Sequence, residues 1–172
     1  MRYSRASSLA VAVVGLLVVA ACTEAVVARG GSFKTQYLAA RSALEAGKYD
    51  RAIAGYQALL QDAGVMEPRV RLEYSHSLLR TDRYLEASQQ ARIVSQSNDV
   101  STRLAALAVA GTAEHELALG ALARGERGAA VKAQLTSAAA AFDLVLKQAS
   151  VFDPLGVLAE RRSGIAASLK SL

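Results

Sequence analysis

From residue 32 onward, apolar residues recur at intervals of three or four positions, which is the spacing of one face of an α-helix. No stretch shows the strict alternation of apolar and polar residues that marks a half-buried β-strand. Short turns at Gly47-Lys48 and Thr81-Asp82 interrupt the pattern, and helices joined by such turns pack as antiparallel pairs. The pattern therefore predicts an all-α fold.

Residues suited to helix ends indicate where individual helices begin. Ser32 is placed to cap the first helix, and Glu67-Pro68 opens another, with proline where its missing N–H costs nothing. Ser101 is expected to cap a long helix, in which Gly111 is a small residue suited to a close helix crossing. Asp153-Pro154 is expected to begin the last helix, with aspartate as the N-cap.

Residues 1–22 follow a different pattern. Arg2 and Arg5 precede an unbroken apolar stretch over 9–21, and Cys22 follows directly. A charged start, a short apolar run and small residues before a cleavage point are the layout of an export signal. At about 1.5 Å per residue this run reaches only ~20 Å, short of the ~30 Å hydrocarbon core of a bilayer. It therefore predicts a removable signal rather than a membrane-spanning helix.

The sequence Val19-Ala20-Ala21-Cys22 resembles the lipobox of bacterial lipoproteins. The resemblance implies that residues 1–21 are removed, that acyl chains are attached at Cys22, and that residues 22–31 form a tether. Two or more acyl chains hold a protein stably on a bilayer. Thr23 stands where the family has aspartate for inner-membrane retention, which favours the periplasmic face of the outer membrane. The alternative is a secretory signal cleaved nearby, which would leave Cys22 as a free cysteine in a soluble periplasmic protein.

Composition points to a helical protein held together by packing. The 172 residues include two prolines, one cysteine and no tryptophan, and 52% of them are hydrophobic. With Cys22 as the only cysteine, no intramolecular disulfide can form. Removal of residues 1–21 takes two of the 20 basic residues and none of the 15 acidic ones, leaving a net charge of +3. That charge is too mild to predict nucleic-acid binding.

The first two helix pairs form an internal repeat at an offset of 35 residues. Residues 44–52 (LEAGKYDRA) align with residues 79–87 (LRTDRYLEA). The alignment matches three pairs of residues: Leu44 with Leu79, Tyr49 with Tyr84 and Ala52 with Ala87. A period near 34 residues in helix–turn–helix units is typical of tetratricopeptide repeat (TPR) arrays.

Details of the first repeat strengthen this resemblance. Gly47-x-Tyr49-x-x-Ala52-Ile53-x-x-Tyr56 is similar to the turn and second helix of a TPR unit, and Ala40 takes the small position where two helices cross. In the second repeat Asp82 replaces the glycine and Ser75 the small crossing residue. The resemblance implies a TPR-like α-α superhelix of about three hairpins. Its parts would be repeats over 33–67 and 68–100, an extended third hairpin over 101–150 and a capping helix over 154–171.

Candidate catalytic and metal-binding groups are few. Glu73-x-x-His76 has a spacing found in di-iron bundles, but the sequence lacks the second such pair that a di-iron site needs. The side chains of Glu114-His115-Glu116 fan out by about 100° per residue and cannot converge on one ion. No Gly-x-Ser-x-Gly nucleophile elbow occurs. We therefore expect no enzyme activity, no cofactor and no bound metal.

In TPR arrays the first helix of each repeat lines the concave face, so the resemblance implies a partner-binding surface there. Eight residues take the corresponding positions: Lys34, Tyr37, Arg41, Leu44, Arg69, Leu72, His76 and Arg80. Four of these are cationic, which suits a partner segment with acidic and apolar residues. The asparagines of the family's peptide-carboxylate clamp are missing from the sequence, so a C-terminal carboxylate is not expected as the ligand. The alternative is that these cations only form a solvated face.

Together these features favour a non-enzymatic adaptor that is lipid-anchored in the cell envelope and binds an envelope protein or peptide. The architecture resembles small TPR lipoproteins that act as pilotins or as assembly factors for pili and secretion systems. Two alternatives stay open. One is a scaffold for outer-membrane or cell-wall assembly, and the other is an accessory to an envelope enzyme that binds a small ligand within the third hairpin.

Overall fold

The computed structural model describes residues 31–148 and 153–172. Within these ranges all regular structure is helical, which confirms the all-α prediction. The helices are α2 (Phe33–Glu45), α3 (Tyr49–Leu59), α4 (Glu67–Leu79), α5 (Tyr84–Val94), α6 (Val100–Ala123), α7 (Ala129–Gln148) and α8 (Val157–Lys170). Two 3-10 turns, Leu60–Asp62 and Gly64–Met66, join α3 to α4. The predicted signal over 1–21, Cys22 and all of the tether except Gly31 lie outside the described residues.

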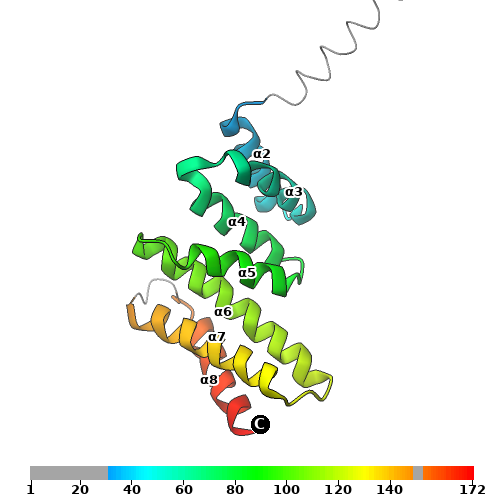
Figure 1. The fold of residues 1–172 in the computed structure, drawn as a ribbon, viewed down its shortest axis with the longest axis vertical. Coiled ribbons are helices and arrows are strands. Elements are labelled where there is room, and N and C mark those ends of the chain that lie inside the picture. Colours follow the sequence, from blue (N-terminus) through cyan, green and yellow to red (C-terminus); the bar gives the residue numbers. More distant parts are fainter. Residues whose placement is uncertain (1–30, 149–152) are drawn as a thin grey trace, which may run out of the picture.

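The helices form an elongated stack of pairs, α2 with α3, α4 with α5 and α6 with α7, and α8 packs on α7 (Figure 1). Helix α4 also contacts both α2 and α6, so the first helices of the three pairs adjoin one another along one side of the stack. The α2–α3 pair lies at one end of the molecule, and α7 and α8 lie at the other (Figure 1).

Three of the helices end in the same kind of turn. Gly47, Asp82 and Gly125 have positive φ angles of 70°, 59° and 83°. In each case the next N–H donates to a carbonyl five residues back: Lys48 to Ala43, Arg83 to Leu78 and Glu126 to Ala121, at 2.8, 3.1 and 3.0 Å. This bond closes a Schellman-type helix end. Asp82, the residue that departs from the TPR pattern, thus adopts the same left-handed conformation as the glycine it replaces.

Small residues allow close crossings within two of the pairs. A Cβ added to Gly55 would lie 2.8 Å from the Cβ of Ala40, so the absence of a side chain at Gly55 lets α2 and α3 approach closely there. A Cβ added to Gly111 would lie 2.8 Å from Cε1 of Phe142 and 3.2 Å from the Cβ of Ala141 on α7. Ala40 and Gly111 are therefore confirmed as crossing residues. Gly55 completes the first crossing and was not expected from the sequence.

The predicted cap of the first helix is confirmed and that of the long helix is wrong. The Ser32 side chain accepts a hydrogen bond from the Thr35 N–H at 3.3 Å. The long helix α6 begins one residue before Ser101, and its N-cap is Asp99, whose carboxylate accepts the Thr102 N–H at 2.7 Å. Aspartate and serine are comparable N-caps, and the negative charge of Asp99 also interacts favourably with the helix N-terminus.

The start of the last helix also differs from the prediction. Helix α8 begins at Val157, so Pro154 lies in the preceding turn, where Gly156 has a φ of 72°. Although Asp153 lies outside α8, its side chain still accepts hydrogen bonds from N–H groups in the first turn of the helix. Its carboxylate accepts the N–H groups of Leu158 at 2.9 Å and Ala159 at 3.0 Å.

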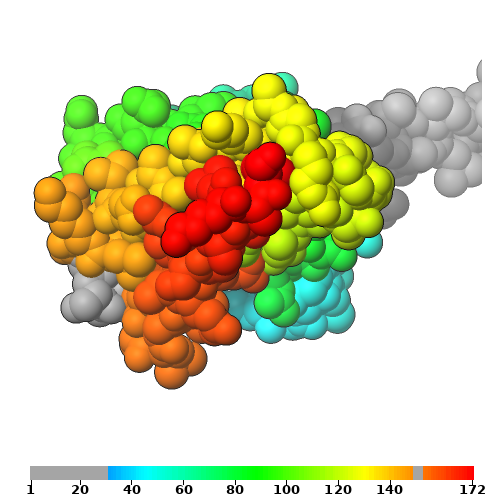
Figure 2. Space-filling view, turned by 90° about the horizontal axis from the view of Figure 1, so that it is seen from below, coloured from blue at the N-terminus to red at the C-terminus, as the bar shows by residue number. Residues whose placement is uncertain are grey.

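Separate core clusters stabilise the two ends of the stack. The N-terminal cluster includes the fully buried Tyr56, Val70 and Leu78, and a C-terminal cluster includes Leu135, Phe142 and Ile165. Helix α7, with 20 residues, is long and apolar enough to span a membrane by length and composition. Its buried residues pack with residues of α6 and α8, which is typical of a core helix. Seen from the C-terminal end, α8 lies across α7 (Figure 2).

Candidate functional site

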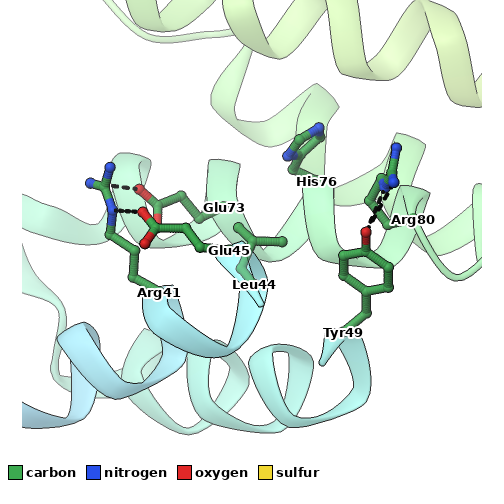
Figure 3. Close-up of a pocket in the computed structure, with 7 residues that line it drawn as sticks. All are labelled: Arg41, Leu44, Glu45, Tyr49, Glu73, His76 and Arg80. Carbon is green, nitrogen blue, oxygen red and sulfur yellow. Dashed lines mark hydrogen bonds and ion pairs between the residues drawn. The ribbon is translucent and has the colours of Figure 1, made fainter. Parts of the chain in front are cut away.

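Two adjoining pockets form a groove along the side where α2, α4 and α6 meet. The first encloses about 420 Å³ and is lined by Arg41, Leu44, Glu45, Tyr49, Glu73, His76 and Arg80 (Figure 3). The second encloses about 390 Å³ and is lined by His76, Leu79, Arg80, Asp82, Tyr84, Thr112, Glu116 and Arg161. We call the surface formed by these residues the concave groove. His76 and Arg80 line both pockets, so they mark the junction between them.

The structure brings together part of the surface expected from the sequence. Arg41, Leu44, His76 and Arg80 line the first pocket. Tyr37 and Arg69 reach the same region indirectly, because both donate a hydrogen bond to Glu73. Lys34, which is exposed, and Leu72, which is half-buried, do not line either pocket of the groove.

Glu73 is the centre of a polar cluster in the first pocket. Its side chain is only 11% exposed. One carboxylate oxygen accepts hydrogen bonds from the Tyr37 hydroxyl at 2.8 Å and from Arg69 Nε at 2.6 Å, and the other accepts a short hydrogen bond from the Tyr56 hydroxyl. Nη1 of Arg41 lies 3.9 Å from the same carboxylate. Residues of α2, α3 and α4 are thereby tied to one buried charge.

The electrostatics of Glu73 follow from these neighbours. Burial by itself would raise the pKa of the Glu73 carboxyl, but hydrogen bonds from Tyr56, Tyr37 and Arg69 bring the pKa below its ordinary value. Burial and the adjacent carboxylate in turn raise the pKa of Tyr56, which keeps its proton and remains a donor. An ionised Glu73 offsets the positive charge of Arg69, and Glu45 offsets that of Arg41, so two of the four cations expected on this surface are already paired.

Arg80 has a different environment. Its Nε and Nη2 donate to the Tyr49 hydroxyl at 3.1 and 2.9 Å, and its guanidinium carbon lies 5.3 Å from the centre of the Tyr49 ring (Figure 3). The phenol therefore orients Arg80 without neutralising its charge. No ion-pair partner of Arg80 occurs among the described residues.

His76 lies one helical turn before Arg80 on α4 (Figure 3). The surrounding groove walls lower the pKa of His76, and the positive charge of Arg80 lowers it further, while Glu73 acts in the opposite direction. The imidazole is therefore mostly neutral at pH 7, and it offers one donor and one acceptor nitrogen to the groove.

The second pocket extends the groove toward the C-terminal end of the stack. Arg161 of α8 donates to Glu116 of α6 at 2.7 Å, and the Tyr84 hydroxyl donates to Asp82 at 2.6 Å. Both carboxylates in this pocket are therefore already engaged by residues of the chain. The last helix thus contributes a side chain to the groove in addition to covering α7.

Sequence reasoning missed several residues of the groove. Glu73 was considered only as part of a metal-binding spacing, and Glu45, Tyr49, Tyr84 and Arg161 were not assigned to the site. A usable signal existed for Glu73, because Arg69 precedes it by four residues and such pairs meet on one helix face. Nothing local in the sequence could bring Arg161 to Glu116, since 45 residues separate them.

The residues of the Glu114-His115-Glu116 group have other partners in the structure. Glu114 binds Arg92 through two hydrogen bonds at 2.8 and 2.6 Å, and Glu116 binds Arg161. His115, between them, is buried, with Nδ1 3.4 Å from Arg161. No cluster of three or more metal-ligating side chains occurs within residues 31–148 and 153–172.

No protein-family model, curated protein or solved structure matches this chain. The chemistry of the concave groove is therefore the guide to function.

Proposed function

We propose that this chain is a non-enzymatic adaptor that binds a segment of another envelope protein in its concave groove. In this proposal the helical pairs form a TPR-like array, and acyl chains on Cys22 hold the array at the periplasmic face of the outer membrane. The observation that carries the proposal is the groove itself, in which residues of α2, the first turn of α3, α4, α6 and α8 meet around the shared residues His76 and Arg80.

The TPR-like interpretation is supported by two geometric regularities. The Schellman-type ends at Gly47 and Asp82 lie 35 residues apart, which is the offset of the sequence repeat. Helix α4 contacts both α2 and α6, as the first helices of successive TPR units do. Gly125 repeats the turn after the longer α6, which fits a third hairpin with extended helices.

The chemistry of the groove supports a peptide segment as the ligand. The groove is open and consists of two pockets in succession, whereas small-molecule sites usually bury most of the ligand surface. Its lining combines apolar side chains such as Leu44 and Leu79 with arginines and tyrosines. Tyrosine and arginine are enriched among the residues that dominate protein-protein binding energies.

The lipid anchor is supported by the order of Arg2, Arg5, the apolar residues 9–21 and the lipobox-like Val19-Ala20-Ala21-Cys22. Acyl chains would supply stable attachment without a membrane-spanning helix. The resemblance to pilotin-like lipoproteins makes a subunit of a pilus or secretion system the class of partner to examine first.

Site-specific photo-crosslinking in intact cells tests this proposal. A photoreactive residue at Glu45, which is exposed in the groove, should crosslink one defined envelope protein. The same residue at Ala54, which is exposed on α3 and lines a separate pocket on a different surface, should not. Equal crosslinking from both positions, or none from Glu45, would contradict groove binding. Labelling with a fatty-acid analogue tests the anchor, since the label should be lost in Cys22→Ser.

A further inference from the structure

Resting on the proposed function, we infer that an acidic side chain of the partner protein binds at the junction of the two pockets, with its carboxylate between Arg80 and His76. The sequence predicted a broad cationic surface for the partner, and the structure indicates this one position within it as the binding site for an acidic side chain. Four observations lead to it: the orientation of Arg80, the pairing of the other charges, the placement of His76 and the apolar walls beside them.

Some of the N–H donors of Arg80 are bound by Tyr49, and the others face the groove without a partner among the described residues. A guanidinium has five N–H donors, and two of those of Arg80 point to the Tyr49 hydroxyl. Within the part of the chain that the structure describes, the remaining donors, on Nη1 and Nη2, have no hydrogen-bond partner. Two parallel N–H groups of this kind match the spacing of the two oxygens of a carboxylate.

Three of the four carboxylates that line the groove are already paired with arginines of the chain. Glu45 accepts from Arg41 at 2.9 Å, Glu73 accepts from Arg69, Tyr37 and Tyr56, and Glu116 accepts from Arg161. Asp82 accepts from Tyr84. The phenol does not neutralise Asp82, but none of the four carboxylates forms an ion pair with Arg80, so among the described residues the positive charge of Arg80 has no counter-charge within salt-bridge distance. A carboxylate brought by a partner is the complement of that charge.

His76 adds a second donor at the same point. It lies four residues before Arg80 on α4 and lines both pockets, and its side chain has no hydrogen-bond partner among the described residues. A carboxylate bound between the two residues favours the protonated imidazole and opposes the effect of Arg80 on it. Binding is therefore expected to take up a proton and to strengthen as the pH falls.

Other groups around His76 also bear on this pH dependence. The charged and titratable residues that line the two pockets with it are Arg41, Glu45, Tyr49, Glu73, Arg80, Asp82, Tyr84, Glu116 and Arg161. Three of the carboxylates among them are paired with arginines as described above, and His76 is the one imidazole that lines these two pockets, so we assign a change near neutral pH to His76.

The apolar residues nearest the junction indicate what should flank the acidic residue. Leu44 lines the first pocket and Leu79 the second. A partner segment with an apolar residue on each side of a glutamate or aspartate would bury apolar area against these walls.

Two short peptides provide the test. Both are pentapeptides with an acetylated N-terminus and an amidated C-terminus, and both have a leucine on each side of the central residue. The central residue is glutamate in one peptide and glutamine in the other. Titrated into the full mature chain, the glutamate peptide should bind about tenfold more tightly, the usual effect of a charged hydrogen-bond pair. Arg80→Gln should remove this difference. Arg124→Gln, an equal loss of charge at a residue that pairs with Glu126 outside the groove, should preserve it.

Titrations at different pH values distinguish the contribution of His76 to binding from that of Arg80. Wild-type affinity for the glutamate peptide should rise between about pH 8 and about pH 6, and His76→Gln should abolish that rise while keeping the preference for glutamate. Tyr49→Phe, which keeps the ring but frees Arg80, should weaken glutamate binding.

Three results would overturn the inference: no binding of the glutamate peptide at millimolar concentration, equal binding of the two peptides, or an Arg80→Gln variant that still prefers glutamate. Such a result alongside specific crosslinking from Glu45 would leave the adaptor proposal standing. Glutamate-selective binding without any crosslinked partner would support the acidic site and count against the adaptor function.

Discussion

At the scale of single residues, Glu73 connects three helices through one buried carboxylate. Its carboxylate is bound by side chains from α2, α3 and α4, so its removal affects all three helices. In Glu73→Gln a neutral amide replaces the charged acceptor of two phenols and Arg69. We expect the free energy of unfolding to fall by about 2 kcal/mol, the usual cost of losing hydrogen bonds to a buried charge. Urea denaturation at pH 7 measures this change.

A matched substitution at Glu86 provides the control. Glu86 is paired with Arg83 on α5, and both side chains are more than two-fifths exposed. Exposed ion pairs contribute little, so Glu86→Gln should change the unfolding free energy by less than about 0.5 kcal/mol. A similar loss in both variants would mean that the Glu73 cluster is no stronger than a surface ion pair.

The same carboxylate predicts how stability depends on pH. Because the pKa of Glu73 is lower in the folded chain than in the unfolded one, its contribution is complete above the unfolded value of about 4.3 and is lost as the pH falls toward the folded value. The difference in unfolding free energy between wild type and Glu73→Gln should therefore be constant above about pH 5 and narrow below about pH 4. Urea denaturation over this pH range measures it, and a difference that widens in acid would contradict the assignment.

At the scale of helices, two glycines should respond in opposite ways to the same substitution. Gly164 is exposed in α8 with open space around it, so Gly164→Ala should stabilise the chain by about 0.5–1 kcal/mol through helix propensity. Gly111 lies against the ring of Phe142, so Gly111→Ala should destabilise by about 1–3 kcal/mol through overpacking. Shifts in urea midpoint measure both. A stabilising Gly111→Ala would show that α6 and α7 separate at little cost.

Helix-level features were predictable where a residue type has one dominant local role. The turn at Gly47, the cap at Ser32 and the small crossing residue Ala40 are short-range features, and the structure has each of them. The starts of α6 and α8 were misplaced for different reasons: two capping residues lie close together before α6, whereas Asp153 binds the first turn of α8 from four residues before the helix begins. Asp99 and Ser101 compete for one cap, and a choice between them depends on the packing of the whole helix.

At the scale of the whole molecule, the all-α fold was predictable from the sequence. The residues that line the groove were predictable only in part. The positions of His76 on α4 and of Arg80 at its C-cap follow from the repeat, since helical periodicity assigns them to one face. The partners of Glu73 come from three helices, and Arg161 reaches the groove from the far end of the chain. Such contacts depend on how the pairs stack, which no local pattern specifies.

The stacked arrangement also determines how far a local defect should spread. Leu59 belongs to the N-terminal cluster and Phe142 to the C-terminal one, and contacts between helices join mainly neighbours in the chain. Stability in such arrays is a sum of local and nearest-neighbour contributions. Leu59→Ala and Phe142→Ala each create a cavity that costs roughly 2–5 kcal/mol. We expect hydrogen exchange to accelerate in α2–α4 for Leu59→Ala and in α6–α8 for Phe142→Ala, with the opposite end unchanged. Uniform acceleration along the chain in both variants would instead mean that the stack unfolds as one cooperative unit, and the groove between its ends would then be as rigid as the cores on either side.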